Sequence, residues 1–270
     1  MARLSRWLIN LAVIYALLVG GMLLARRSLI YPFDQTVAWT GDIPDLLIKD
    51  VERPDGTTLV VWAAEPEFKR PVLYYFMGNV GNLGYSEAWF REFRALGYGI
   101  VAMGYQGGGG ADGKPSENAL KGDAQYIWDN MEKVLRIRVP QEDRYILGQS
   151  LGAGIAADLA SKNENAGTVL ITPFTRLCEV AEHQIKIVPV CRLMWDEHYR
   201  IDTQLPEISA PVLILHGTDD ATIPFEMSER LVETSPNATL KVYEGGTHND
   251  LRLFGAVRDI DAFISGLRAN

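Results

Sequence analysis

Short apolar runs alternate with amphipathic stretches along most of the chain, and this alternation predicts strands that are separated by helices. The order is typical of a mostly parallel sheet that carries helices on both faces. Pro54-Asp55-Gly56 separates the first two runs as a hairpin turn would, so the sheet should begin with an antiparallel pair. The eight expected strands are residues 46–52, 57–63, 71–77, 98–104, 143–148, 167–171, 211–216 and 238–243. An amphipathic helix from about Leu251 to Leu267 should end the chain.

The N-terminus has a different pattern, because Trp7 to Ala25 is almost wholly apolar. A run of this length spans the hydrocarbon core of a bilayer. It is longer than the apolar region of a usual signal peptide and no clear small-x-small cleavage site follows it, which favours a retained helix over a cleaved leader. We therefore expect residues 1–27 to be a transmembrane anchor and residues 28–270 to be one globular domain, since 47% hydrophobic residues can bury a sizeable core.

Charge bears on how the protein lies at a membrane. Arg3 and Arg6 precede the apolar run, and Arg26 and Arg27 follow it, so only the initiating amine favours a cytoplasmic N-terminus and a non-cytoplasmic globular domain. Of the 26 basic residues these four are at the anchor, which leaves 22 against 34 acidic residues from Ser28 onward, a net charge of −12. Such a domain repels nucleic acid and anionic headgroups, so no nucleic-acid partner is expected.

The first candidate for chemistry is the string Gly148-Gln149-Ser150-Leu151-Gly152, which lies between an apolar strand and an alanine-rich helix. A G-x-S-x-G turn at such a junction holds its serine in a strained conformation, with the hydroxyl exposed for attack on a carbonyl. On its own the string is more often an ordinary strand-to-helix turn. A serine nucleophile also needs a base and a group that orients the base.

Both groups follow downstream, in the order serine, acid, histidine that an α/β-hydrolase uses. Asp220 comes after the strand at 211–216, and His248 lies on the loop after the strand at 238–243. Parallel strands bring these loops to one edge of the sheet, so Ser150, Asp220 and His248 are the expected catalytic residues.

The neighbouring candidates are less suitable. Asp219 is adjacent to the acid, but consecutive loop residues rarely point the same way, and only one of them can orient the base. His183 and His198 precede the acid and lie in an insertion, whereas His216 is expected to end its strand in a structural role.

An oxyanion needs two hydrogen-bond donors, because negative charge builds on the carbonyl oxygen in the transition state. Leu151 supplies one backbone N–H at the start of a helix, where the helix dipole adds to it. The loop 78–82 after the third strand should supply the second donor, for which Asn79 is the candidate. This Gly- and Asn-rich loop would otherwise be an ordinary turn, and no G-x-x-x-x-G-K-[ST] sequence is present that would make it a phosphate site.

Several strings together resemble a known family, the single-pass, membrane-anchored α/β-hydrolases of the serine aminopeptidase and lysophospholipase-like branch. They are MGNVGN at 77–82, YQGGGGADGKPSE at 105–117, GQSLG at 148–152, TPFTRL at 172–177, PVLILHGTDDATIP at 211–224 and GGTHND at 245–250. The resemblance extends over roughly residues 28–268 and implies the same catalytic and oxyanion residues. It departs at Met77, where the family usually has His, and at 106–109, where it has Arg-Gly-Tyr-Gly. At these positions the side chains that would support the oxyanion loop, residues 78–82, differ from those of the family.

Residues 172–205 are expected to form a short helical cap, since they contain more apolar side chains than a connection needs. Those side chains either seal the core edge or face the site and receive an acyl group. Cys178 and Cys191 lie in this insertion and could pair if the domain faces an oxidising compartment. Because spacing alone does not establish the geometry of a bridge, we expect two separate packing residues. No metal or cofactor is expected, because no H-E-x-x-H, C-x-x-C or calcium-loop motif occurs.

The expected protein is an α/β-hydrolase fold with an eight-stranded sheet behind one transmembrane helix. It would be a membrane-anchored serine hydrolase that cleaves an ester-type acyl bond of a small, lipid-like substrate through an acyl-enzyme intermediate. An aminopeptidase-like serine peptidase and a thioesterase use the same residues and stay open. From another class, a catalytically silent, membrane-tethered binding module also stays open.

Overall fold

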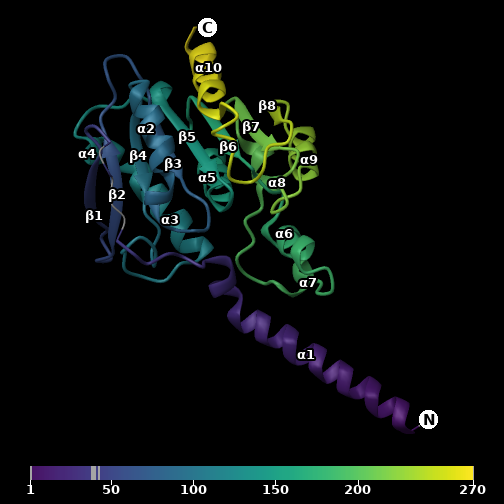
Figure 1. Cartoon of the computed structure of the whole chain (residues 1–270). Coiled ribbons are helices and arrows are strands. Elements are labelled where there is room, and N and C mark those ends of the chain that lie inside the picture. Colours follow the sequence, from purple (N-terminus) through teal and green to yellow (C-terminus); the bar gives the residue numbers. More distant parts are fainter. Residues whose placement is uncertain (1, 38–40, 42, 270) are drawn as a thin grey trace.

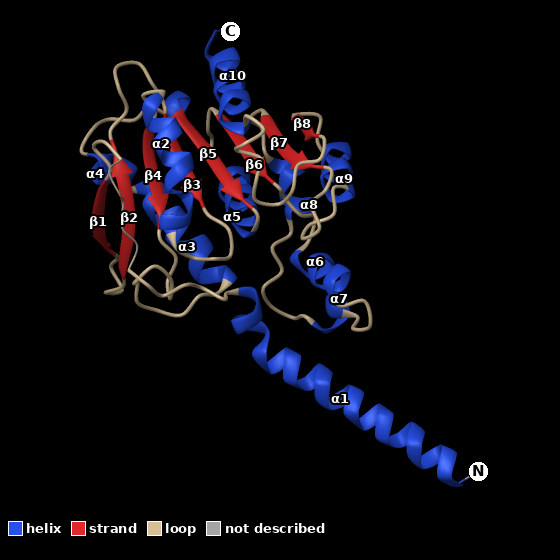
Figure 2. Ribbon diagram, in the orientation of Figure 1, coloured by secondary structure: helices blue, strands red, loops and turns tan. Residues whose placement is uncertain are grey.

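The computed structural model describes residues 2–37, 41 and 43–269; Met1 of the expected anchor and Asn270 lie outside them. An eight-stranded sheet forms the core of the domain, in the order β1-β2-β4-β3-β5-β6-β7-β8 (Figures 1 and 2). The strands are β1 Leu47–Glu52, β2 Thr58–Ala64, β3 Val72–Phe76, β4 Gly99–Met103, β5 Arg144–Gln149, β6 Gly167–Ile171, β7 Val212–Gly217 and β8 Ala238–Tyr243. All eight predicted strands are present, with bounds that differ by at most a residue or so.

Strand direction follows from the connections. The hairpin joins β1 and β2 antiparallel, as predicted, and β2 also pairs antiparallel with β4. Every other pair is parallel, because helical segments connect these strands. The central strands β3, β4 and β6 are buried along their whole length, as expected for strands that helices cover on both faces.

Helices lie on both sides of the sheet (Figure 2). α2 and α10 pack together, whereas α3 packs against α5. The bounds are α2 Glu87–Ala95, α3 Glu117–Asp129, α4 Met131–Leu135, α5 Leu151–Lys162, α8 Ile201–Gln204, α9 Glu226–Thr234 and α10 Ala256–Ala269. The last helix begins later than predicted, because turns occupy the preceding residues and Gly255 has a φ of 91°.

The segment 172–205, where a cap was expected, begins with two short helices, α6 (Leu177–Gln184) and α7 (Val190–Leu193), and ends with α8. Cys178 and Cys191 form a disulfide between α6 and α7, with their Cα atoms 4.8 Å apart, so the expectation of two separate cysteines is wrong. The sequence separation gives no sign of this, because it is the reversal of the chain between α6 and α7 that brings the two residues together.

α1 (Ala2–Ile30) is a single helix that extends away from the domain (Figure 1). Its segment Ser5–Ile30 has a mean hydropathy of 2.3 and is long and apolar enough to cross a membrane. The helix continues past residue 27, where the sequence suggested a boundary, and leads directly into the buried Tyr31 and Phe33.

Candidate active site

Ser150 stands between the end of β5 and the start of α5. Its φ is 53° and its ψ is −118°, a combination that non-glycine residues rarely adopt. The turn is so tight that a Cβ on Gly148 would lie 2.3 Å from the Gly152 carbonyl oxygen, and one on Gly152 would lie 2.3 Å from the Phe76 oxygen. The two glycines of the motif are therefore required by space, and the strain holds the serine hydroxyl at the sheet edge.

His248 and Asp220 reach this serine from the loops after β8 and β7. His248 Nε2 lies 3.0 Å from Ser150 Oγ, and His248 Nδ1 lies 2.7 Å from Asp220 Oδ2. The three side chains thus form a continuous hydrogen-bonded chain. The structure brings together the three residues that the sequence selected, whereas Asp219 is exposed and points elsewhere.

The Asp220 carboxylate is held rigidly, and its side chain is buried. Oδ1 accepts the N–H groups of Thr222 and Ile223 at 2.8 and 2.9 Å. Burial raises the pKa of Asp220, but the hydrogen bonds from His216, His248 and the backbone outweigh it and hold the pKa below the ordinary aspartate value. An ionised carboxylate in this position orients His248 with its Nδ1 proton toward the acid.

His216 is part of this arrangement, which its position at a strand end did not indicate. It is fully buried, and Nε2 lies 3.2 Å from Asp220 Oδ2 and 3.1 Å from the Ile223 oxygen. Both neighbours are acceptors, so Nε2 carries a proton, and Nδ1 lies 2.6 Å from the Ser228 hydroxyl oxygen. His216 is therefore a donor that fixes the acid from behind. Only the order of strand, histidine and acid in the sequence could have suggested it.

The loop after β3 contacts the serine. A Cβ on Gly78 would lie 3.5 Å from Ser150 Cβ, and Asn79 follows it and lines the same cavity. Among the described residues, neither the Asn79 N–H nor the Leu151 N–H donates to a protein acceptor. Two free backbone donors beside a serine hydroxyl are what an oxyanion requires.

Tyr105 supports this loop at Met77, one of the positions where the sequence departs from the family that it resembles. Its buried hydroxyl donates to the Met77 carbonyl oxygen at 2.6 Å. The main chain that leads into Gly78 and Asn79 is thereby tied to the segment that follows β4. The sequence did not single out this tyrosine, because nothing in the order of residues shows that its hydroxyl reaches β3.

A cavity of about 770 Å³ opens above the serine. Its floor consists of Ser150, His248 and the loop after β3, and its walls come from α2, the cap and α1. Among the described residues that line it, the basic side chains are those of Arg26 and His248, and there is no carboxylate. The volume falls in the range of small-molecule sites, and the walls are suited to an apolar group.

No group of three histidine, cysteine, aspartate or glutamate residues in the described part of the chain is arranged to hold a metal ion. His183 and His198 are exposed on the cap side and do not join the hydrogen-bonded chain at Ser150. The side chains that meet at Ser150 are thus a serine hydroxyl, an imidazole and a carboxylate.

Comparison with known proteins identifies a family and a shared fold. The family model described as serine aminopeptidase, S33, matches residues 69–196 and 190–252. The lysophosphatidylserine lipase ABHD12 of Danio rerio is 31% identical over 182 residues, which are 60% of this chain and 47% of that protein. An uncharacterized protein of Mycobacterium tuberculosis is 32% identical over 78% of this chain and 75% of its own length. The chain thus spans about half the length of the lipase.

Among solved structures, a membrane phospholipase A described as a bacterial virulence factor has a TM-score of 0.66 at 17% identity, and the match covers 98% of this chain and 100% of that one. Est1E from Butyrivibrio proteoclasticus, solved with ferulic acid, has a TM-score of 0.68 at 19% identity over 82% of this chain and 100% of its own. At these identities the likeness shows a shared fold, the α/β-hydrolase fold.

Proposed function

This chain belongs to the serine aminopeptidase, S33, family, and we propose that it is a membrane-anchored hydrolase of carboxylic esters that uses Ser150, His248 and Asp220. The observation that carries the proposal is the continuous hydrogen-bonded chain from Ser150 Oγ through His248 to Asp220. It lies at the floor of an apolar cavity, beside two free backbone N–H groups.

The reaction begins when His248 Nε2 takes the proton of the Ser150 hydroxyl and the oxygen attacks the ester carbonyl. The carbonyl oxygen becomes an oxyanion that accepts the N–H groups of Asn79 and Leu151. His248 then gives its proton to the leaving alkoxide, and an acyl-serine remains. A water molecule, deprotonated by the same imidazole, attacks the acyl-serine, which releases the carboxylic acid and restores the hydroxyl.

The cavity supports an acyl substrate over a peptide with a free amino terminus. An aminopeptidase must bind the α-ammonium of its substrate, and a buried or partly buried cation needs an anionic partner. The described cavity walls contain no carboxylate, whereas apolar side chains of the cap and α1 make up most of them. An acyl chain would bury its methylenes there, each with a gain of about 0.8 kcal/mol.

Relatives are consistent with this substrate class. One of them is named a lysophosphatidylserine lipase, and a protein of the same fold is named a membrane phospholipase A. Helix α1 would hold the enzyme at the bilayer where such substrates occur, because Ser5–Ile30 has the length and hydropathy of a span. The disulfide between Cys178 and Cys191 supports a non-cytoplasmic, oxidising side for the catalytic domain.

The test is a comparison of ester and amide substrates by the full-length protein in detergent. We expect p-nitrophenyl esters to be hydrolysed with rates that rise from acetate to medium chains, and amino-acid anilides to be cleaved little. A profile that is flat or falls with chain length, or anilide cleavage faster than ester cleavage, would favour the peptidase.

A further inference from the structure

One face of α1 is covered by the rest of the protein. From residue 19 to residue 30 the half-buried positions follow the helical period, whereas the positions between them are exposed. Val19, Met22, Leu23 and Arg26 on the covered face line the cavity above Ser150. On the other face Leu24 is 88% exposed and is not part of the described cavity lining. The helix therefore contributes a wall of the candidate site in addition to its apolar outer surface.

The opposite wall is the cap, which lies alongside the same helix. Val180, Val188 and Leu193 face the cavity from α6, α7 and their connection. Figure 1 shows α6 and α7 projecting from the sheet on the side where α1 leaves the domain. Ser150, the cap and α1 thus line one cavity, and the α1 residues that line it extend from Val19 to Ile30.

This space extends into the apolar part of α1. The Tyr15 hydroxyl donates to the Ile187 carbonyl oxygen at 2.8 Å, so the tip of the cap reaches Tyr15. At a rise of about 1.5 Å per residue, Tyr15 lies about 15 Å inside the end of the apolar run at Ala25, or about half of a hydrocarbon core of about 30 Å. Ile187 itself is 73% exposed, as a residue in contact with lipid would be.

Polar contacts near the C-terminal end of α1 hold the helix and the cap together. Arg26 binds Asp196 through Nε and Nη2 at 2.7 and 2.6 Å, and its guanidinium lies 4.3 Å from the centre of the Trp195 ring. Arg27 and Tyr31 both contact the buried Glu197 carboxylate. The charge of Arg26 is therefore neutralised within the cavity wall, and the guanidinium acts as a clamp between α1 and the cap.

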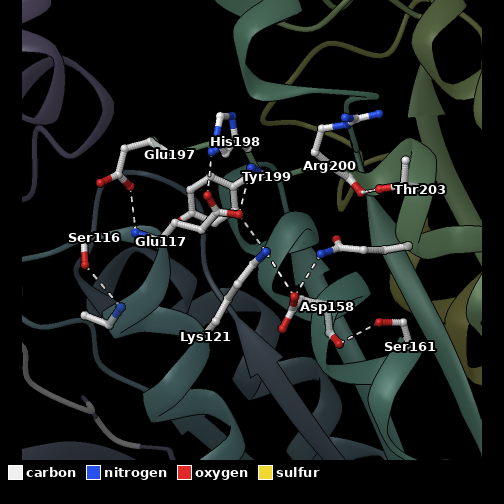
Figure 3. A network of polar contacts seen from close by, with 12 residues as sticks. Ser116, Glu117, Lys121, Asp158, Ser161, Glu197, His198, Tyr199, Arg200 and Thr203 are labelled. Atoms are coloured by element: carbon white, nitrogen blue, oxygen red, sulfur yellow. Dashed lines mark hydrogen bonds and ion pairs between the residues drawn. The ribbon is translucent and has the colours of Figure 1, made fainter. Parts of the chain in front are cut away.

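The segment behind this clamp is fixed to the core. Figure 3 shows Glu117 at the start of α3 accepting the main-chain N–H groups of His198 and Tyr199, while Lys121 bridges Glu117 and Asp158 at 2.6 and 3.1 Å. Backbone φ values of 58° at Glu197 and 37° at Tyr199 show that these contacts hold the chain in an uncommon conformation. The clamp thus sets the position of α1 relative to Ser150.

We propose that the transmembrane helix is part of the substrate site: the acyl chain of a membrane lipid lies between α1 and the cap, and the ester reaches Ser150 directly from the bilayer. The proposal rests on the proposed ester hydrolysis. It assigns Met22 and Leu23 as residues that determine chain length, because they stand where the chain passes from the lipid toward the serine.

The test uses the full-length protein in detergent and compares the rate at which it hydrolyses p-nitrophenyl decanoate with the rate for p-nitrophenyl butyrate. The ratio of these two rates is the decanoate-to-butyrate ratio. Leu23→Trp should fill the channel and lower the decanoate-to-butyrate ratio about tenfold or more, since each methylene excluded from an apolar site costs about fourfold in binding. Leu23→Ala should raise the ratio or move the optimum to longer chains. Leu24→Trp and Leu24→Ala, on the lipid-facing side, are the matched controls and should leave the ratio within about twofold of the unmodified protein.

The outcomes separate the two proposals. If Leu23 and Leu24 variants give the same chain-length profile while a fluorophosphonate still labels them, α1 is an anchor only and this inference is wrong. If the unmodified protein neither hydrolyses butyrate nor reacts with the probe, the proposed hydrolase function itself fails. If Leu23→Trp misfolds and loses probe labelling, Leu23→Ala decides: a chain-length optimum that moves to longer esters supports this inference, and an unchanged or shorter optimum contradicts it.

Discussion

Replacing Asp220 by Asn should disable the site through the wrong imidazole tautomer. Oδ1 accepts two main-chain N–H groups, from Thr222 and Ile223, so the amide must keep its carbonyl oxygen there. Its NH₂ then takes the place of Oδ2 and faces His248 Nδ1, 2.7 Å away in the native protein. A donor in that place forces Nδ1 to be the acceptor and puts the proton on Nε2. His248 can then no longer accept the proton of Ser150.

The expected loss is about 10⁴-fold in kcat, as tautomer reversal causes in other serine triads, or about 5.4 kcal/mol of transition-state stabilisation. The assay is the hydrolysis of p-nitrophenyl butyrate at substrate saturation, with thermal unfolding of the same samples to show that the fold persists. Because the pKa of Asp220 is held below its ordinary value, the native carboxylate is ionised between about pH 5 and pH 9, and the loss should appear throughout that range.

Asp219→Asn is the matched control. Asp219 is exposed, and its backbone N–H, which donates to the Gly246 oxygen at 2.9 Å, is unaffected by the substitution. Its kcat should stay within about threefold, since exposed side chains outside such networks contribute little. If Asp219→Asn were the damaging variant, or if Asp220→Asn lost less than about tenfold, the assignment of the orienting acid would be wrong.

Three further changes test the surroundings of the site. His216→Ala should lower kcat about tenfold and the free energy of unfolding by about 1–3 kcal/mol, measured by urea denaturation, because the buried acid loses a donor. Tyr105→Phe should lower kcat with little change in KM, since it releases the Met77 carbonyl beside the oxyanion donors without touching the ground-state substrate; a raised KM alone would contradict that role. Cys178→Ser together with Cys191→Ser should lower the free energy of unfolding of the cap by about 3 kcal/mol and reduce decanoate hydrolysis more than butyrate hydrolysis. Equal losses of the two activities would argue against a cap that binds the acyl chain.

The sequence predicted the sheet well because hydrophobic period and turn residues are local signals. The strand at 238–243 and the hairpin at Pro54-Asp55-Gly56 have the bounds and direction that their patterns imply. The relation of Ser150 to His248 could also be anticipated, because parallel strands bring their carboxyl ends to one edge whatever the details of packing.

Features that depend on distant contacts could not be predicted in this way. The pairing of Cys178 with Cys191 requires the geometry of the cap, and the support of Met77 by Tyr105 requires the register of β3 and β4. The sequence also did not indicate that α1 lines the cavity: an apolar run of this length predicts an anchor, and only the positions of Met22 and Leu23 in the structure show that the helix faces the cavity.

Covalent labelling tests the proposed nucleophile most directly. The full-length protein should react with a fluorophosphonate probe to give a single adduct, which peptide mass spectrometry locates on Ser150, and Ser150→Ala should lose both the adduct and ester hydrolysis while it unfolds at the same temperature. An adduct on another serine, or labelling that persists in Ser150→Ala, would contradict the proposed mechanism.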